Sequence, residues 1–321
     1  MQATSDVETL RQDQVEHYLS SLCVNPALQK ELGPSGFLGL LHHQHTTRIS
    51  FSTMSYHEGS VLEPYKADQQ MNAITLQEAY EQILMLRKGG TCAALNKLFA
   101  SLLKTLGYEV YAHKAQVFGE HDYKYPAAHR FSTVKIDNNI YLIDIGFSDH
   151  APKDMLLLYR NGQLATEPQG KGLFQYKFSL DDEDGLILQY FTKNTWRNIY
   201  AFQNQTTYSE QEYAVQSEAV NQTITGFRTH FFFATRSTIR GRIQMLDSTL
   251  RYQYEGSESE SIQEETVTIS PQVSLSTFLT TMDEFFGLKY TGPFRSKGKE
   301  FTTEVQADAV EKLDKIKSHL M

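Results

Sequence analysis

The 321-residue sequence has only two cysteines, Cys23 and Cys92. So few cysteines exclude a disulfide framework and fit a reducing compartment, and a cytoplasmic protein is therefore expected. The sequence also lacks any run close to the roughly 18 consecutive apolar residues that a membrane-spanning helix needs. Its first residues are polar and acidic, unlike a signal or transit peptide. We therefore expect a protein without a membrane partner.

Positive charge is also scarce, because 30 Lys and Arg stand against 38 Asp and Glu, for a net charge of −8. This balance argues against a nucleic-acid partner. The histidines His42, His43 and His45 suggest a metal cluster, but no carboxylate or cysteine completes it. We therefore expect a histidine-rich helix end and no metal site. Tryptophan occurs once, whereas 19 Phe and 18 Tyr fit either a packed core or an aromatic-lined pocket.

Three regions of the chain differ in their residue pattern. Residues 1–107 show helical periodicity, with a capping box of Thr75 and Glu78 that predicts a helix start. Residues 108–205 contain short runs rich in β-branched and aromatic residues, which predict strands. Residues 206–321 mix both patterns. We therefore predict an α+β protein with a helical, a β and a mixed domain at these boundaries.

Cys92 stands at the predicted start of a helix, directly behind Gly89, Gly90 and a threonine. A thiol in the first turn of a helix lies at the positive end of the helix dipole, near N–H groups without intrahelical partners. Both effects favour the thiolate, which is the nucleophilic form. The glycines allow a sharp turn and leave room for a substrate to approach. A small buried cysteine after an interhelical turn is the equally favoured alternative.

A nucleophilic cysteine needs a base and a group that orients the base, and His129 and Asp144 are the candidates. They lie on successive predicted strands and are separated by an odd number of residues, which places both side chains on one face of a hairpin. A turn at 138–139 would leave them four residues out of register. A turn at 137–138 makes them diagonal neighbours, so the chemistry predicts this tighter pairing or a bulge.

Asp144 lies in the apolar run YLIDIGF, where a carboxylate is costly unless it is paired. Backbone amides near the following turn could satisfy it. Because His129 lies on the same face, we favour the His–Asp pair and predict that Cys92, His129 and Asp144 form a catalytic triad.

This arrangement of Cys92, His129 and Asp144 resembles the arylamine N-acetyltransferase family. The segments R-G-G-x-C-x-E/Q-x-N and D-V-G-F-G of that family are matched here by Gly89, Gly90, Cys92, Asn96, Asp144, Gly146 and Phe147. LHHQHTTRISF, WRNIYAF and SLSTFLTTMDEFFGL resemble further landmarks, so the likeness runs through most of the chain. The resemblance implies an α+β fold with an N-terminal helical bundle, a central β-barrel and a C-terminal α/β lid.

The sequence departs from the family pattern near the nucleophile. Lys88 replaces an arginine, Ala94 replaces the usual Glu or Gln, and residues 50–53 read Ser-Phe-Ser-Thr where the family has P-F-E-N. Ser148 replaces the last glycine of G-F-G. These changes alter the side chains around Cys92. The sequence therefore indicates the type of reaction more clearly than it indicates the acyl donor and acceptor.

The resemblance implies an acyltransferase that moves an acetyl or related acyl group from acyl-coenzyme A to the nitrogen of an arylamine or hydrazine. Cys92 would carry the acyl group as a thioester in a ping-pong reaction, and acetyl-coenzyme A would be a cosubstrate rather than a permanently bound cofactor. By the same resemblance, Phe51, Gly146 and Phe147 contact the aromatic acceptor, and Thr229 contacts coenzyme A. Both phenylalanines could equally be core residues.

Three other readings stay open at this point. An amide synthase of the same fold would transfer a thioester-bound chain to an internal arylamine, forming a macrolactam or amide. A cysteine protease or transglutaminase-like enzyme would use the same triad chemistry on peptides. A binding protein that kept the fold would not catalyse at all. The partners expected are a small aromatic amine and acyl-coenzyme A, and the sequence favours no particular oligomeric state.

Overall fold

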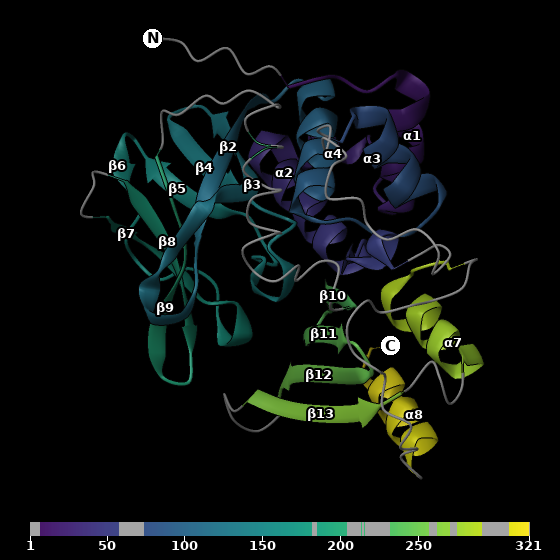
Figure 1. Ribbon diagram of the computed structural model, residues 1–321. Coiled ribbons are helices and arrows are strands. Elements are labelled where there is room, and N and C mark those ends of the chain that lie inside the picture. The colour runs from purple at the N-terminus through teal and green to yellow at the C-terminus, as the bar shows by residue number, and fades with distance from the viewer. Residues whose placement is uncertain are drawn as a thin grey trace.

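The structure is a computed structural model that describes residues 7–57, 74–181, 185–203, 213, 215, 232–256, 262–269, 275–290 and 308–320. Helices near the N-terminus form one side of the molecule, a large curved sheet forms the other, and a smaller sheet with two helices lies below them (Figure 1). The site described below lies where the start of α4 meets β3 and the end of β4.

The N-terminal helices pack around α4 (Figure 1). Thr75 accepts a hydrogen bond from the Glu78 amide while the Glu78 carboxylate accepts one from Thr75, so the predicted capping box is confirmed. The apolar stripe of α4 is buried against α2, α3 and strand β3. The helices are α1 (Gln12–Ser21), α2 (Leu28–Arg48), α3 (Leu76–Tyr80), which continues as a π-helical turn (Glu81–Met85), and α4 (Cys92–Thr105).

Eight antiparallel strands form a nearly closed barrel in the order β6-β5-β4-β3-β2-β9-β8-β7. Gln169 helps to close it, because its backbone pairs with Tyr176 while its side chain bonds both backbone groups of Leu157 at 2.7 Å. Apolar side chains from alternate positions fill the interior. The strands are β2 (Glu109–Phe118), β3 (Lys124–Ile136), β4 (Asn139–Ile143), β5 (Leu156–Arg160), β6 (Gln163–Leu164), β7 (Tyr176–Leu180), β8 (Leu186–Thr192) and β9 (Thr195–Phe202).

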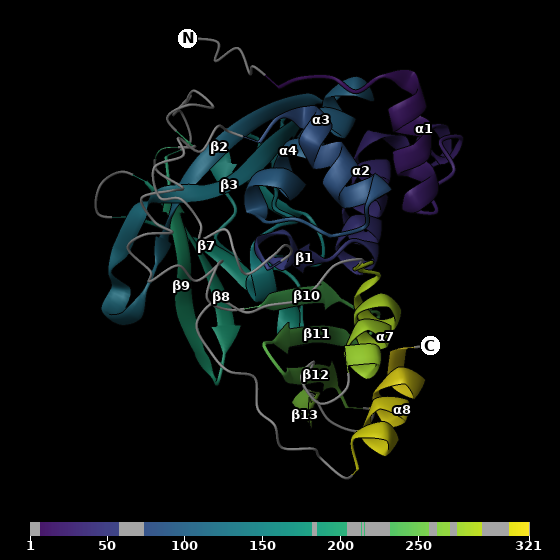
Figure 2. The same cartoon turned by 45° about the vertical axis from the view of Figure 1, so that its right-hand side comes forward.

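The smaller sheet has the order β1-β10-β11-β12-β13 and is covered by α7 and α8 (Figure 2). Its edge strand β1 comes from the N-terminal region, so the sheet joins two distant parts of the chain. The predicted division at residues 107 and 205 stays a prediction. The elements are β1 (Phe51–Ser52), β10 (Phe233–Ser237), β11 (Gly241–Leu246), β12 (Thr249–Glu255), β13 (Ile262–Thr268), α7 (Leu275–Phe286) and α8 (Ala309–Leu320).

The expected α+β class is confirmed, with N-terminal helices, a central barrel and a C-terminal sheet with helices. Among the helices that the structure describes, none combines the length and the apolar character that crossing a bilayer requires.

Candidate active site

Cys92 is the first residue of α4, and only 7% of its surface is exposed. The chain reaches it through Gly89, whose φ of +65° is a conformation that favours glycine. A Cβ on Gly89 would lie 2.6 Å from the Ser50 carbonyl oxygen, and Gly90 bridges to Phe51 of β1. The room beside Gly89 is therefore filled by the β1 segment, and the expectation that this glycine leaves space for a substrate is wrong.

His129 and Asp144 lie on the β3–β4 hairpin, whose register matches the tighter of the two predicted pairings. Ile136 faces Asn139, so the turn lies at residues 137–138. His129 Nε2 is 2.7 Å from Asp144 Oδ2, and both side chains are almost completely buried. The prediction that the two are neighbours on one face is confirmed.

A bulge in β3 directly precedes His129. Ala115 of β2 pairs with His129 and Gln116 pairs with Ala127, so Ala128 is an extra residue in β3. An extra residue bends a strand and re-aims the side chains beside it. The Ala128 carbonyl consequently lies beside the Cys92 sulfur, at 4.0 Å. The bulge that the sequence offered as an alternative would have drawn the His129 and Asp144 strands together, but the β3–β4 register shows none. The bulge described here lies in the β2–β3 pair and was not predicted.

The imidazole of His129 connects the thiol with the carboxylate. Its Nε2 is engaged by Asp144, and its side chain also hydrogen bonds to Cys92, which leaves Nδ1 as the nitrogen that faces the sulfur. Burial alone would lower the pKa of His129. The charge and hydrogen bond of Asp144, together with Cys92, outweigh burial and raise the pKa of His129 to about 9. The ring is therefore basic enough to accept the thiol proton.

Asp144 stays ionised in spite of its complete burial. Burial alone would raise the pKa of the Asp144 carboxyl group. The charge of His129 and hydrogen bonds from His129, Asn96 and the Gly146 amide instead lower this pKa below its ordinary value. A charged carboxylate is thus held behind the imidazole.

Two residues that sequence reasoning did not assign to the site complete its support. Asn96 was noted only as a motif match; its Nδ2 donates to Asp144 Oδ1 at 3.0 Å, and its Oδ1 accepts from the Ile145 amide. Tyr200 of β9 donates its hydroxyl to Asp144 Oδ2 at 3.1 Å, and its ring lies 4.9 Å from that of His129. Asn96 lies one helical turn after Cys92, a spacing that could have indicated its role.

Tyr213 is a third residue that sequence reasoning missed. Its hydroxyl lies 3.7 Å from Cys92 Sγ and donates to the Ala128 carbonyl at 2.9 Å. The side chain is buried, with 3% of its surface exposed. It comes from a part of the chain 121 residues beyond the nucleophile, and no sequence pattern connects the two.

The structure places the residues expected to contact the acceptor at different depths. Phe147 is half-buried, and its ring meets that of His129 edge-on at 4.6 Å. Gly146 packs against α4, because a Cβ there would lie 2.9 Å from the Cys92 Cα. Phe51 is buried against Phe233 in the helical core. Thr229 lies outside the described residues, and the substrate contacts of all four stay predictions.

The departures from the family pattern have structural partners. The Ser50 hydroxyl donates to the Phe286 carbonyl at 2.6 Å. The Thr53 hydroxyl oxygen accepts from the Phe233 amide at 2.9 Å. These hydroxyl groups join the β1 segment to α7 and β10. Ala94 is buried within α4, against Gly90.

The histidine-rich end of α2 is an interior feature. His42 and His45 are fully buried, whereas His43 pairs with Asp154 at 2.8 Å. Within the described ranges, no group of three or more His, Cys, Asp or Glu side chains is placed to hold a metal ion. Burial lowers the pKa of His42 to about 4 and that of His45 well below its ordinary value, so both rings are neutral at pH 7.

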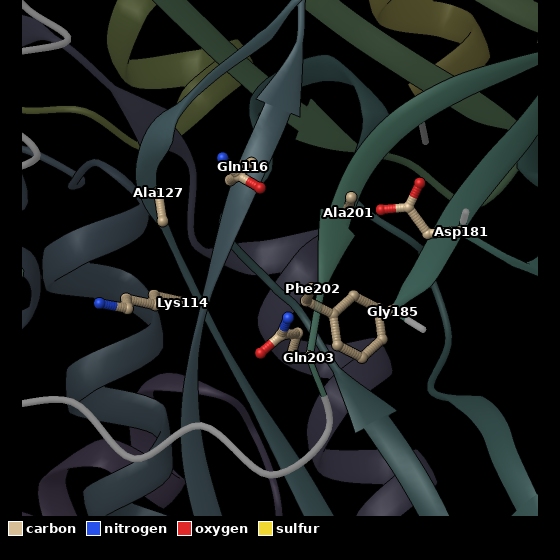
Figure 3. Close-up of a pocket in the computed structure, with 8 residues that line it drawn as sticks. All are labelled: Lys114, Gln116, Ala127, Asp181, Gly185, Ala201, Phe202 and Gln203. Carbon is tan, nitrogen blue, oxygen red and sulfur yellow. The ribbon is translucent and has the colours of Figure 1, made fainter. Parts of the chain in front are cut away.

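A pocket lies beside the catalytic segment between β2, β3 and β9 (Figure 3). It adjoins the site through Ala127, the residue before the bulge. Cys92, His129 and Asp144 do not line it. Its lining residues are Lys114, Gln116, Ala127, Asp181, Gly185, Ala201, Phe202 and Gln203.

Comparison with known proteins identifies the family. A model of the N-acetyltransferase family matches residues 37–289, well over half of the chain. The pineal gland isozyme NAT-10 of Gallus gallus, an arylamine N-acetyltransferase, is 25% identical over 162 residues, which are 46% of this chain and 52% of that protein. The arylamine N-acetyltransferase of Mycobacterium tuberculosis is 28% identical over 136 residues, 40% of this chain and 46% of that protein. The chain therefore belongs to the arylamine N-acetyltransferase family, as its motifs indicated.

The match spans about half the length of these curated relatives. Solved structures extend the likeness of the fold to nearly the whole chain. The arylamine N-acetyltransferase of Salmonella typhimurium has a TM-score of 0.70 at 18% identity and covers 97% of this chain and 100% of its own. The Mycobacterium marinum enzyme in complex with CoA has a TM-score of 0.68 at 20% identity and covers 85% of this chain and 92% of its own.

Proposed function

We propose that the protein transfers an acetyl or related acyl group from acyl-coenzyme A, through a Cys92 thioester, to the nitrogen of an arylamine or hydrazine. The observation that carries this proposal is the buried line of contacts from Cys92 through His129 to Asp144. It supplies a nucleophile, a base and a charge that stabilises the protonated base. Family membership and the CoA complex of the Mycobacterium marinum relative support the choice of donor.

In the first half-reaction the proton of the Cys92 thiol moves to His129 Nδ1, and the sulfur attacks the thioester carbonyl. The tetrahedral intermediate collapses as the bond to the coenzyme A sulfur breaks, and the imidazolium returns its proton to that leaving group. Exchange of one thioester for another is nearly balanced. Backbone N–H groups at the start of α4 are suited to stabilise the oxyanion.

In the second half-reaction the amine attacks the acyl-Cys92 carbonyl. His129 takes the proton that the amine loses, and then protonates the departing Cys92 sulfur, so that an amide and the free thiol are formed. We expect Phe147, whose ring meets the His129 ring edge-on, to contact an aromatic acceptor. Gly146 lets the chain after Asp144 pack closely against the start of α4. By the family resemblance, Gly146 and Phe51 would contact the acceptor, and Thr229 would contact coenzyme A.

The proposal is tested with acetyl-coenzyme A and a simple arylamine, following free coenzyme A and the intact protein mass. We expect the protein to gain one acetyl group at Cys92 and to lose it when the amine is added. The Cys92→Ala variant should show neither step, whereas Cys23→Ala, which changes the exposed second cysteine, should show both. Acetyl transfer that survives Cys92→Ala would contradict the mechanism.

The acceptor and donor classes are tested in the same assay with a panel of acyl thioesters, arylamines and hydrazines. Acetyl-coenzyme A consumption with simple arylamines supports the acetyltransferase. Labelling of Cys92 by long-chain thioesters alone, without acetylation, would favour the amide synthase reading instead.

A further inference from the structure

The Cys92 sulfur has a neighbour that belongs neither to the triad nor to its supports. The Tyr213 hydroxyl lies 3.7 Å from Sγ, and its 3% exposure places it in the interior. A phenol has one proton to donate and can turn it about the C–O bond. In the structure this proton is directed to the Ala128 carbonyl, at 2.9 Å.

The position of the Ala128 carbonyl follows from the bulge in β3. Ala128 has no register partner in β2, and the β4 pairing begins only at Ser132. The extra residue of a bulge is left out of the ladder, so its carbonyl is available to other groups. Here it lies 4.0 Å from Sγ and accepts the Tyr213 proton.

This carbonyl creates an electrostatic problem when Cys92 ionises. A carbonyl oxygen can accept a hydrogen bond from a thiol, but it faces a thiolate with its negative end. A buried anion is costly unless donors surround it. His129, once protonated, supplies one donor. The Tyr213 hydroxyl can supply a second donor. Among the contacts described above, it is the side-chain group at the sulfur that can stop donating to the Ala128 carbonyl and donate to the thiolate instead.

We propose that Tyr213 is a hydrogen-bond donor to the Cys92 thiolate. While Cys92 is a thiol, the Tyr213 proton binds the Ala128 carbonyl. When the S–H bond breaks and the proton moves to His129 Nδ1, the hydroxyl rotates and donates to the sulfur. Tyr213 keeps its own proton throughout, so the thiol proton alone is transferred. The function of this switch in acyl transfer rests on the proposed function, but its effect on the ionisation of Cys92 does not.

The groups that set the ionisation of Cys92 come from four parts of the chain. His129 on β3 hydrogen bonds to the thiol, and Asp144 after β4 holds the imidazole. Tyr200 on β9 donates to Asp144, its ring lies beside that of His129, and it affects Cys92 through these two residues. Tyr213 contacts the sulfur directly. Removal of its hydroxyl should therefore alter the titration of Cys92 while leaving the His129–Asp144 contact in place.

The test is the pH dependence of Cys92 alkylation by iodoacetamide. Tyr213→Phe removes only the hydroxyl, and all variants carry Cys23→Ser because Cys23 is exposed and would also react. Loss of a hydrogen bond to an anion should raise the midpoint of alkylation by about one pH unit. Below the midpoint, the rate should fall about tenfold. The ultraviolet absorbance of the thiolate provides a second reading of the same midpoint.

Tyr111→Phe is the matched control. Tyr111 is also a strand-borne tyrosine whose hydroxyl has a hydrogen-bond partner, Glu109, but it lies toward the surface of β2. Its loss should leave the alkylation midpoint of Cys92 unchanged. Equal midpoints in Tyr213→Phe and Tyr111→Phe would overturn the proposal.

The readout separates this inference from the proposed function. A raised midpoint in Tyr213→Phe supports the hydroxyl switch, even if the unmodified protein transfers no acetyl group. An unchanged midpoint in a protein that does transfer acetyl groups overturns the switch alone.

Discussion

Asn96 and Asp144 are 48 residues apart in the sequence and are joined by a hydrogen bond of 3.0 Å. Asn96 lies one turn after Cys92 on α4, whereas Asp144 follows the strand that pairs with the His129 strand. The amide side chain also bonds the Arg130 carbonyl and the Ile145 amide. One residue thus fixes the helix that presents the nucleophile against the hairpin that presents the base.

Replacement of this residue should weaken both folding and catalysis. Asn96→Ala removes one of the hydrogen bonds to the Asp144 carboxylate and the bonds to the Arg130 carbonyl and the Ile145 amide, all in the interior. Each buried loss costs about 1–3 kcal/mol. We expect a lower midpoint in urea unfolding and slower acylation of Cys92. Asn138→Ala, in the exposed turn of the same hairpin, is the control. Equal midpoints in the two variants would show that Asn96 is not a structural link.

The charge of Asp144 should be visible in the pH dependence of acylation. His129 must be protonated for the thiolate–imidazolium pair to exist, and Asp144 raises the pKa of His129 to about 9. In Asp144→Asn this support is lost, so His129 should release its proton at lower pH. We expect the alkaline limb of the acylation rate to move down by about 1 to 3 pH units. Asp149→Asn, with a partly exposed carboxylate, should leave the limb in place; an unmoved limb in Asp144→Asn would contradict the assigned role.

The buried histidines of α2 should make the fold sensitive to acid. His45 has no hydrogen-bond partner on either ring nitrogen among the described residues, and its pKa lies well below 6.5 in the folded state. Below pH 6.5 the unfolded chain therefore binds a proton that the folded chain does not, and stability falls as the pH decreases. Between about pH 7.5 and pH 5 we expect this residue alone to remove about 2 kcal/mol.

His45→Phe tests this expectation, because an uncharged ring between Tyr18 and Phe99 cannot titrate. The difference in unfolding free energy between neutral and acid conditions should shrink in this variant. His43→Phe, which changes a ring at the surface of the same helix, should retain the full difference. If both variants lose the same stability in acid, other groups control the transition.

Gly89 should tolerate no side chain. Its φ is +65°, and a Cβ would also approach the Ser50 carbonyl to 2.6 Å. Gly162 has a φ of +80° with nothing near its Cβ position, so Gly162→Ala measures the backbone strain alone, about 1–2 kcal/mol. Gly89→Ala adds the collision and should cost about 2 to 5 kcal/mol in unfolding free energy. If Gly89→Ala and Gly162→Ala lower the melting temperature equally, the β1 segment moves aside without loss of stability, and the expectation is wrong.

Local patterns in the sequence predict much of the site. The capping box of Thr75, the apolar stripe of α4 and the odd separation of His129 and Asp144 depend on neighbouring residues, and all three agree with the structure. Of the two options that the chemistry left open, the tighter hairpin or a bulge between its strands, the structure has the tighter hairpin.

Contacts between distant segments are what the sequence does not reveal. Tyr200 and Tyr213 reach the triad from β9 and from beyond it, and no periodicity connects them to Cys92. Gly89 was expected to face a substrate, whereas the β1 segment covers it. Ser50 and Thr53 near Phe51 could be recognised from the sequence as departures from the family pattern. Their hydrogen-bond partners in α7 and β10 could not be recognised, because those partners lie 236 and 180 residues further along the chain.

The pairing of β1 with β10 has a consequence for biosynthesis. Thr53 and Phe233 are 180 residues apart, and a ribosome adds about 5–20 residues per second. The segment that covers Gly89 must therefore wait about 10 to 40 seconds for its partner strand. Until that strand emerges, the nascent helical bundle keeps an uncovered edge beside its nucleophile. We therefore expect the reactive thiol to be most vulnerable to oxidation during this interval and to become protected once β10 has paired with β1.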